Sequence, residues 1–136
     1  MKKLISFKVA AQLSLFLFGV IILFHLAVIF GIILFDFVPL DFLWGGRMET
    51  REQLLGFEVL SLAIMVLCFI TVLIHSERLH VPALAGVTRI ILWVLFALFI
   101  LNTIGNILAE TAFEKAFAAI TALLAVLCLR LALGDE

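Results

Sequence analysis

The sequence predicts an all-α integral membrane protein, built as a four-helix up-down bundle with both termini on the cytoplasmic side. Hydrophobic residues make up 66% of its 136 positions and charged residues 14%, against roughly 45–50% and 25% in soluble domains. The chain also contains four apolar segments, each reaching the about 20 residues that span a bilayer as a helix. A water-soluble chain of this size could not bury so much apolar surface, so its solvent must be lipid.

The first helix is predicted over residues 5–37. Its apolar run, residues 9–35, is interrupted only by Gln12, Ser14 and His25. A secretory signal peptide has an apolar core of about 7–15 residues and then a small-x-small cleavage site. This run is longer and no Ala-x-Ala follows it, so we expect an anchor that is retained. Pro39 is expected to end the helix, because proline disfavours helical angles in the preceding residue.

The other three helices are predicted at 51–76, 82–109 and 112–133, in one transmembrane domain that spans residues 1–136. The sequences TREQ at 50–53 and TAFE at 111–114 fit the capping box, in which a threonine oxygen and an acidic or amide side chain satisfy the first helical amides. They predict that the second and fourth helices begin at Arg51 and Ala112. Pro82 suits a first helical turn and predicts the start of the third.

The distribution of basic residues predicts the orientation, since Lys and Arg favour the cytoplasmic side. With the N-terminus inside, the inner side holds Lys2, Lys3, Lys8, Arg78, Arg89 and Arg130. The outer side holds Arg47, Arg51 and Lys115. This asymmetry predicts a multi-pass protein of a bacterial inner membrane with both termini in the cytoplasm.

Polar residues within the apolar segments are the candidates for function. An ionisable group in hydrocarbon costs about 2.5–3.5 kcal/mol on insertion scales, so Glu58 is expected to face the bundle interior or a wet cavity. Asn102, Asn106 and Glu110 are spaced by four and fall on one side of the third helix. Counted from the helix ends at 1.5 Å per residue, Glu58 and Asn102 lie at about the same depth. We therefore expect Glu58 to contact the two amides, with Arg47 reaching it from the outer loop.

These residues predict a polar pocket that opens outward. The predicted ligand-binding residues are Glu58, Asn102, Asn106, Arg47, Thr103, His25, Trp44 and Glu110. The turn at Trp44 to Arg47 is either an anion site for a group such as a lipid phosphate or a flexible turn. His25 is either part of the pocket or a hydrogen-bonded packing residue.

No metal, cofactor or catalytic residue is predicted. His75 and His80 lie at the inner boundary without a metal-ligand spacing. Cys68 and Cys128 lack a Cys-x-x-Cys pattern and are expected to be small apolar fillers. The net charge of −1 gives no field that would attract nucleic acid.

Three motifs carry a resemblance to known sequences: LWGGR at 43–47, EQLLGFE at 52–58 and LNTIGN at 101–106. With them the chain resembles a group of small bacterial four-helix membrane proteins. The resemblance covers most of the chain and implies the same outward-facing residues, but it implies no activity.

The predicted function is binding of a small polar molecule or lipid headgroup. One alternative is a structural role, as an accessory subunit or homo-oligomer in which the polar stripe joins helices. Small-residue stripes on the fourth helix, such as Ala112, Ala116 and Ala119, suit either bundle packing or a second copy. Another alternative is a membrane enzyme with Glu58 and His25 as an acid–base pair, although a non-enzymatic role is favoured because no nucleophile accompanies them. The lipid bilayer is the one certain partner.

Overall fold

The computed structural model describes residues 5–134, and over this range the chain is helical with no strand. The four long helices are α1 (Phe7–Phe35), α2 (Arg51–His75), α3 (Ala85–Ile107) and α4 (Ala112–Ala132). Two short turns are η1 (Trp44–Gly46), between α1 and α2, and η2 (Pro82–Leu84), before α3. All four helices are long and apolar enough to cross a membrane. The predicted all-α membrane fold is therefore confirmed.

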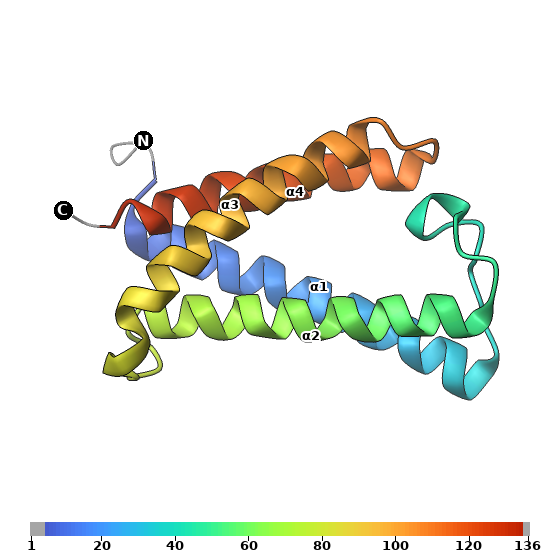
Figure 1. Cartoon of the computed structure of the whole chain (residues 1–136), viewed down its shortest axis with the longest axis horizontal. Helices are drawn as coiled ribbons and strands as arrows, with labels where there is room; N and C mark the ends of the chain where they lie inside the picture. The colour runs from blue at the N-terminus through green and yellow to red at the C-terminus, as the bar shows by residue number, and fades with distance from the viewer. Residues whose placement is uncertain (1–4, 135–136) are drawn as a thin grey trace.

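The helices form an up-down bundle (Figure 1). The two chain ends and the α2–α3 connection lie at one end of the bundle, which we call the terminal end. The α1–α2 and α3–α4 connections lie at the other, which we call the loop end. The helices pack most extensively as the pairs α1 with α2 and α3 with α4. Between these pairs, α2 and α3 are close at the terminal end and diverge toward the loop end (Figure 1).

Threonine caps fix the starts of two helices. The Thr50 hydroxyl accepts a hydrogen bond from the backbone N–H of Gln53 at 3.2 Å. The Thr111 hydroxyl accepts one from the backbone N–H of Glu114, also at 3.2 Å. Each bond satisfies an amide that has no partner within its helix. The predicted starts of α2 and α4, from their capping boxes, are thus confirmed.

The end of α1 differs from the sequence-based prediction. The helix ends at Phe35, ahead of Pro39, because Asp36 adopts a left-handed conformation with φ 52°. The backbone N–H of Phe37 then donates to the carbonyl of Gly31 at 3.1 Å, as in a Schellman-type helix end. Proline is therefore not the residue that terminates this helix.

Two sets of contacts hold the terminal end together. A buried apolar core joins all four helices there and includes Ala10, Phe18, Val72, Leu92, Leu124 and Leu131. In addition, the His75 ring makes hydrogen bonds to the Thr88 hydroxyl on α3 at 3.0 Å and to the Leu131 carbonyl on α4 at 3.1 Å. These contacts explain why the helices converge at this end.

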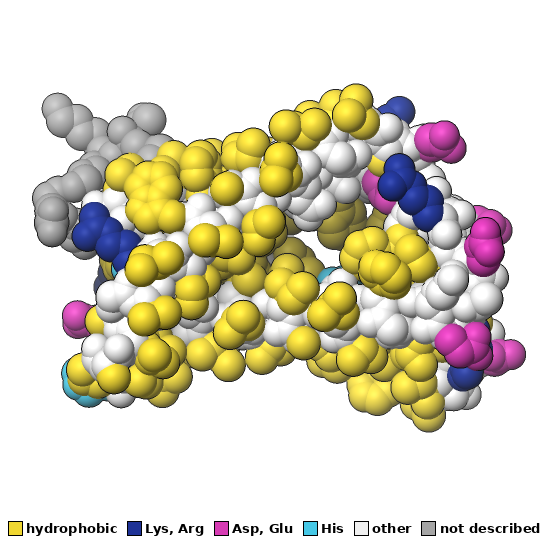
Figure 2. All heavy atoms as spheres, viewed as in Figure 1, with side chains coloured by type: hydrophobic (Ala, Val, Ile, Leu, Met, Phe, Trp, Pro, Cys, Tyr) yellow, Lys and Arg dark blue, Asp and Glu magenta, His cyan; other side chains and the backbone are white. Residues whose placement is uncertain are grey.

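The surface matches a lipid environment. Large hydrophobic side chains are exposed along all four helices, among them Leu23, Phe16, Leu60, Ile90 and Leu101. In Figure 2 hydrophobic atoms cover the length of the bundle, whereas charged side chains gather near its two ends. The chain is a multi-pass membrane protein whose flanks contact lipid.

Candidate functional site

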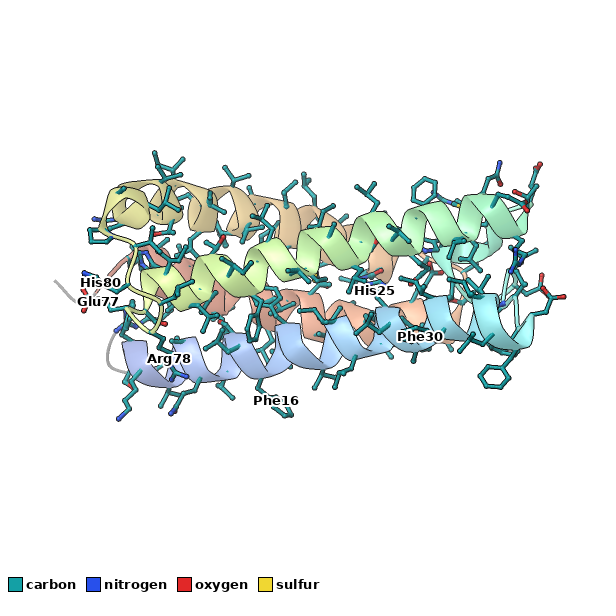
Figure 3. All side chains as sticks on the ribbon, turned by 90° about the horizontal axis from the view of Figure 1, so that it is seen from below. Phe16, His25, Phe30, Glu77, Arg78 and His80 are labelled. Carbon is teal, nitrogen blue, oxygen red and sulfur yellow. The ribbon has the colours of Figure 1, made fainter. Side chains whose placement is uncertain are left out.

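Glu58 is a buried carboxylate with two side-chain partners. Its side chain is 1% exposed. Oε2 lies 2.6 Å from Nδ1 of His25 on α1, and Oε1 accepts a hydrogen bond from the indole N–H of Trp44 at 3.0 Å. Figure 3 labels His25, which lies between α1 and α2. A carboxylate removed from water needs such partners, because an unpaired buried charge is strongly unfavourable.

The register of α1 against α2 brings His25 to Glu58. The guanidinium of Arg51 donates to the carbonyl of Ile32 at 3.0 Å, and its Nε lies 3.4 Å from Oδ1 of Asp36, so the first turn of α2 lies beside the last turn of α1. His25 precedes Ile32 by seven residues (32 − 25), and Glu58 follows Arg51 by seven (58 − 51). Because the helices are antiparallel, equal steps from that contact bring the two side chains to one level.

The turn η1 delivers Trp44 from the α1–α2 connection. Three successive residues there have positive φ angles: 55° at Trp44, 68° at Gly45 and 66° at Gly46. Glycine adopts this conformation freely, whereas in Trp44 it costs about 1–3 kcal/mol. The hydrogen bond to Glu58 and ring packing against Phe57, with centroids 5.3 Å apart, help to offset that strain. These contacts give the turn a defined conformation.

The two hydrogen bonds also determine where a proton can lie. An indole N–H can only donate, so Oε1 of Glu58 must be an acceptor. The exchangeable proton of the pair therefore lies between Oε2 of Glu58 and Nδ1 of His25. The other ring nitrogen of His25, Nε2, has no hydrogen-bond partner among residues 5–134. His25 can thus offer Nε2 to a bound molecule while Nδ1 stays with Glu58.

A cavity of about 1150 Å³ lies beside this pair. All four helices and the α1–α2 connection contribute to its wall. The predicted site residues that line it are His25, Trp44, Arg47, Glu58, Asn102, Asn106 and Glu110. Thr103 does not line it. The polar residues of three helices and two connections therefore face a common space.

The contacts expected within this set differ from those observed. Within the described chain, Glu58 is bonded to neither Asn102 nor Asn106, and Arg47 makes no ion pair with it. Asn106 instead lies with its amide nitrogen 3.5 Å from the Thr121 hydroxyl on α4. The expectation of an amide-bound Glu58 is wrong, because α3 packs closely on α4 and diverges from α2 at the loop end.

Thr103 joins helices and does not face the cavity. Its hydroxyl donates to the Phe99 carbonyl at 2.7 Å and lies 2.9 Å from the hydroxyl of Thr121. Hydrogen bonds of this kind stabilise the packing of membrane helices. The alternative of an interhelical role therefore fits Thr103.

Sequence reasoning missed one acidic wall residue. Glu114 belongs to the predicted capping box, and its carboxylate accepts a hydrogen bond from the Thr111 hydroxyl at 2.8 Å. Its carboxylate oxygens also lie 3.6 Å from where a Cβ on Gly45 would be, so α4 meets the turn η1 there. Phe113 and Phe117, four residues apart on α4, line the cavity as well. This spacing was the available signal for a shared face.

Metal binding has no support in the geometry. Within residues 5–134, no group of three or more His, Cys, Asp or Glu side chains is arranged to hold a metal ion. Cys68 and Cys128 are free thiols, both buried.

Fold and surface together define a multi-pass, four-helix integral membrane protein. No protein-family model, curated protein or solved structure matches this chain. Its function must therefore be inferred from its own geometry.

Proposed function

We propose that this protein binds a small polar molecule or lipid headgroup in a pocket that opens to the extracytoplasmic side of a bacterial inner membrane. The observation that carries the proposal is the buried carboxylate of Glu58, bonded to His25 and Trp44 in the wall of a cavity. Ionisable groups at membrane depth are costly and generally serve a function. A purely structural hydrogen bond would not need open space beside it.

The size and wall of the cavity support a ligand. Small-molecule sites usually measure about 300–1,000 Å³ and combine an apolar wall with a few convergent polar groups. The present cavity is slightly larger, at about 1150 Å³. Its polar groups include His25, Glu58 and Asn102, set among phenylalanine side chains from α1, α2, α3 and α4.

Charge and motif positions support the proposed location. Acidic residues concentrate in the loop-end connections and adjoining turns: Asp36, Asp41, Glu49, Glu52, Glu110 and Glu114. Lys and Arg favour the cytoplasmic side of a membrane, and Lys8, Arg78, Arg89 and Arg130 lie toward the terminal end, which supports an extracytoplasmic loop end. The LWGGR motif contributes Trp44, Gly45 and Arg47 to the cavity wall, and LNTIGN contributes Asn102, Gly105 and Asn106. The motifs that suggest a bacterial group thus coincide with the proposed site.

The proposal is tested by native mass spectrometry of the full chain released from bacterial membranes. Glu58→Gln keeps an acceptor for Trp44 but removes the charge, whereas Glu52→Gln makes the same change at an exposed position outside the cavity. We expect wild type to carry a bound small molecule or lipid. The occupancy of Glu58→Gln should be about tenfold lower, which corresponds to a loss of about 1.4 kcal/mol in binding free energy. Glu52→Gln should match wild type. Wild type without bound mass, or equal occupancy in all three proteins, would contradict the proposal.

An acid–base enzyme is the second candidate, because His25 and Glu58 are 2.6 Å apart and both line the cavity. In this role one group removes a proton from a carbon of an apolar substrate. The other returns a proton at a second carbon, which moves a double bond without net loss or gain of atoms. Nε2 of His25, which has no hydrogen-bond partner within residues 5–134, is the atom that would meet the substrate.

Deuterium uptake distinguishes catalysis from binding. Molecules bound by wild type would be extracted after incubation in D₂O and examined for deuterium at carbon. An enzyme incorporates deuterium, and His25→Gln abolishes incorporation while the molecule stays bound. Unlabelled ligand from wild type rejects this candidate and leaves the binding role intact.

A structural role is favoured by other contacts. The hydroxyls of Thr103 and Thr121 and the amide of Asn106 meet between α3 and α4. If this is the main purpose of the polar stripe, as in an accessory subunit or homo-oligomer, Asn106→Leu should lower stability or assembly while no ligand is found on wild type. Retained ligand on wild type with Glu58-dependent occupancy would count against it.

A further inference from the structure

We propose that the ligand is an amphipathic lipid whose acyl chain enters the cavity sideways from the membrane, through a gap between α2 and α3. This inference rests on the proposed binding function and names the class of ligand and its route. Three features carry it: the polarity gradient within the cavity, the open side of the bundle, and free space at Gly105.

The cavity is polar at the loop end and apolar toward the middle of the bundle. Arg47, Glu110 and Glu114 lie on its wall at the loop end, in or beside the two connections. Toward the middle of the bundle the wall consists mainly of apolar side chains, including Met65, Cys68, Leu95, Leu98 and Leu124. A small polar molecule would find few hydrogen-bond partners in that part of the cavity. An acyl chain fills it with apolar contacts while its head stays among the charged groups.

The gap between α2 and α3 opens toward the surrounding lipid. The two helices separate toward the loop end (Figure 1), and a hollow is visible on this face between them (Figure 2). Several side chains line the cavity and are also exposed on the outside of the bundle. Phe57 and Ile64 on α2 are each 43% exposed, and Leu98 on α3 is 52% exposed. The exposure of these lining residues, together with the hollow on this face, indicates an incomplete wall between α2 and α3.

Gly105 lies on the α3 side of this gap. It lines the cavity, and a Cβ built on it would have no atom within 4 Å. A side chain added here therefore meets no neighbouring atom at its Cβ, and a large one would occupy cavity space that the acyl chain needs. Gly86, on the same helix, also has nothing within 4 Å but lies outside the cavity. The two glycines form a matched pair for a test.

The charges at the polar end favour a head that carries an amine. The cavity wall carries the carboxylates of Glu110 and Glu114 and the guanidinium of Arg47. An ammonium group is attracted by the carboxylates, and a phosphate beside it can pair with Arg47. Phosphatidylethanolamine carries both groups and is therefore the probe of choice, with phosphatidylglycerol as the anionic comparison.

The experiment measures lipid retention by the full chain. Wild type, Gly105→Phe, Gly86→Phe and Glu58→Gln are purified in detergent, equilibrated with palmitoyl-oleoyl phosphatidylethanolamine and examined by native mass spectrometry. We expect one lipid on wild type and on Gly86→Phe, and about tenfold lower occupancy on Gly105→Phe, equivalent to 1.4 kcal/mol. Thermal unfolding of both glycine variants tests that they remain folded. Glycerophosphoethanolamine, which lacks acyl chains, should bind more weakly than the lipid.

The outcomes separate this inference from the proposed function. Equal retention by Gly105→Phe and Gly86→Phe, with reduced retention by Glu58→Gln, would overturn sideways entry and leave the polar pocket standing. Binding of glycerophosphoethanolamine as tight as that of the lipid would overturn the acyl-chain assignment, and stronger retention of phosphatidylglycerol would overturn the amine-bearing head. No retention by wild type of any of these three probes would overturn the inference. If the protein from bacterial membranes also carries no bound mass, the proposed function fails with it.

Discussion

Nδ1 of His25 lies 2.6 Å from Oε2 of Glu58, although the residues are 33 positions apart in the chain. The contact joins α1 to α2, and both residues line the cavity. Trp44 completes the arrangement by donating to the second carboxylate oxygen. A polar group of α1, one of α2 and one of the connection between them therefore depend on one another, which makes the cluster sensitive to single substitutions.

Glu58→Ala should destabilise the folded protein by about 1–3 kcal/mol, because it leaves the indole N–H of Trp44 without its acceptor and Nδ1 of His25 without its partner. Glu58→Gln should cost less, since its amide can still accept from Trp44. The measurement is unfolding of the purified protein with a denaturing detergent. Glu52→Ala, at an exposed position on α2, should change stability by no more than about 0.5 kcal/mol. Equal losses at the two glutamates would argue against a special role for Glu58.

Trp44→Phe should cost about 0.5–1.5 kcal/mol, the net value of a typical hydrogen bond. The ring contact with Phe57 can persist in this variant, so the loss reports mainly the bond to Glu58. Trp93→Phe is the control, because Trp93 is 43% exposed and does not line the cavity. The same unfolding assay applies. In a Glu58→Ala background the effect of Trp44→Phe should nearly vanish, and an undiminished effect would show that the indole acts elsewhere.

Thr121→Val should weaken the pairing of α3 with α4 by about 1 kcal/mol, given that an interhelical hydrogen bond in a membrane protein averages about 0.6 kcal/mol. The hydroxyl that it removes contacts both Thr103 and Asn106. Ser14→Ala provides the opposite case. Its buried hydroxyl has no hydrogen-bond partner in the described part of the chain, so its removal should be neutral or slightly stabilising. A larger loss from Ser14→Ala than from Thr121→Val would contradict this reading of the two hydroxyls.

Thiol labelling of intact cells checks the proposed orientation. Glu49→Cys lies in the α1–α2 connection and Glu77→Cys in the α2–α3 connection, at opposite ends of the bundle. A membrane-impermeant maleimide should label the first variant and not the second. Background should be low because both natural cysteines are buried. The reverse pattern would establish that the loop end faces the cytoplasm.

Local sequence determined the helices of this protein. The apolar runs exceed the thickness of a bilayer, and within hydrocarbon a chain must satisfy its backbone polar groups internally, which favours helices. Two of the starts follow from threonine caps that act within four residues. The burial of Glu58 was also foreseeable from its cost in lipid. These features depend on near neighbours in the chain and on the solvent, which the sequence itself reveals.

The partners of Glu58 were decided by the tertiary structure. Depth counted from helix ends gives the level of a residue but not which helix it faces. The contact of Arg51 with Ile32 fixes the register of α2 on α1, which brings His25 to Glu58, and three left-handed residues turn Trp44 toward the same carboxylate. Meanwhile α3 packs on α4, so Asn106 meets Thr121. Register and helix pairing arise from side-chain packing between distant segments, which no local pattern in the chain encodes.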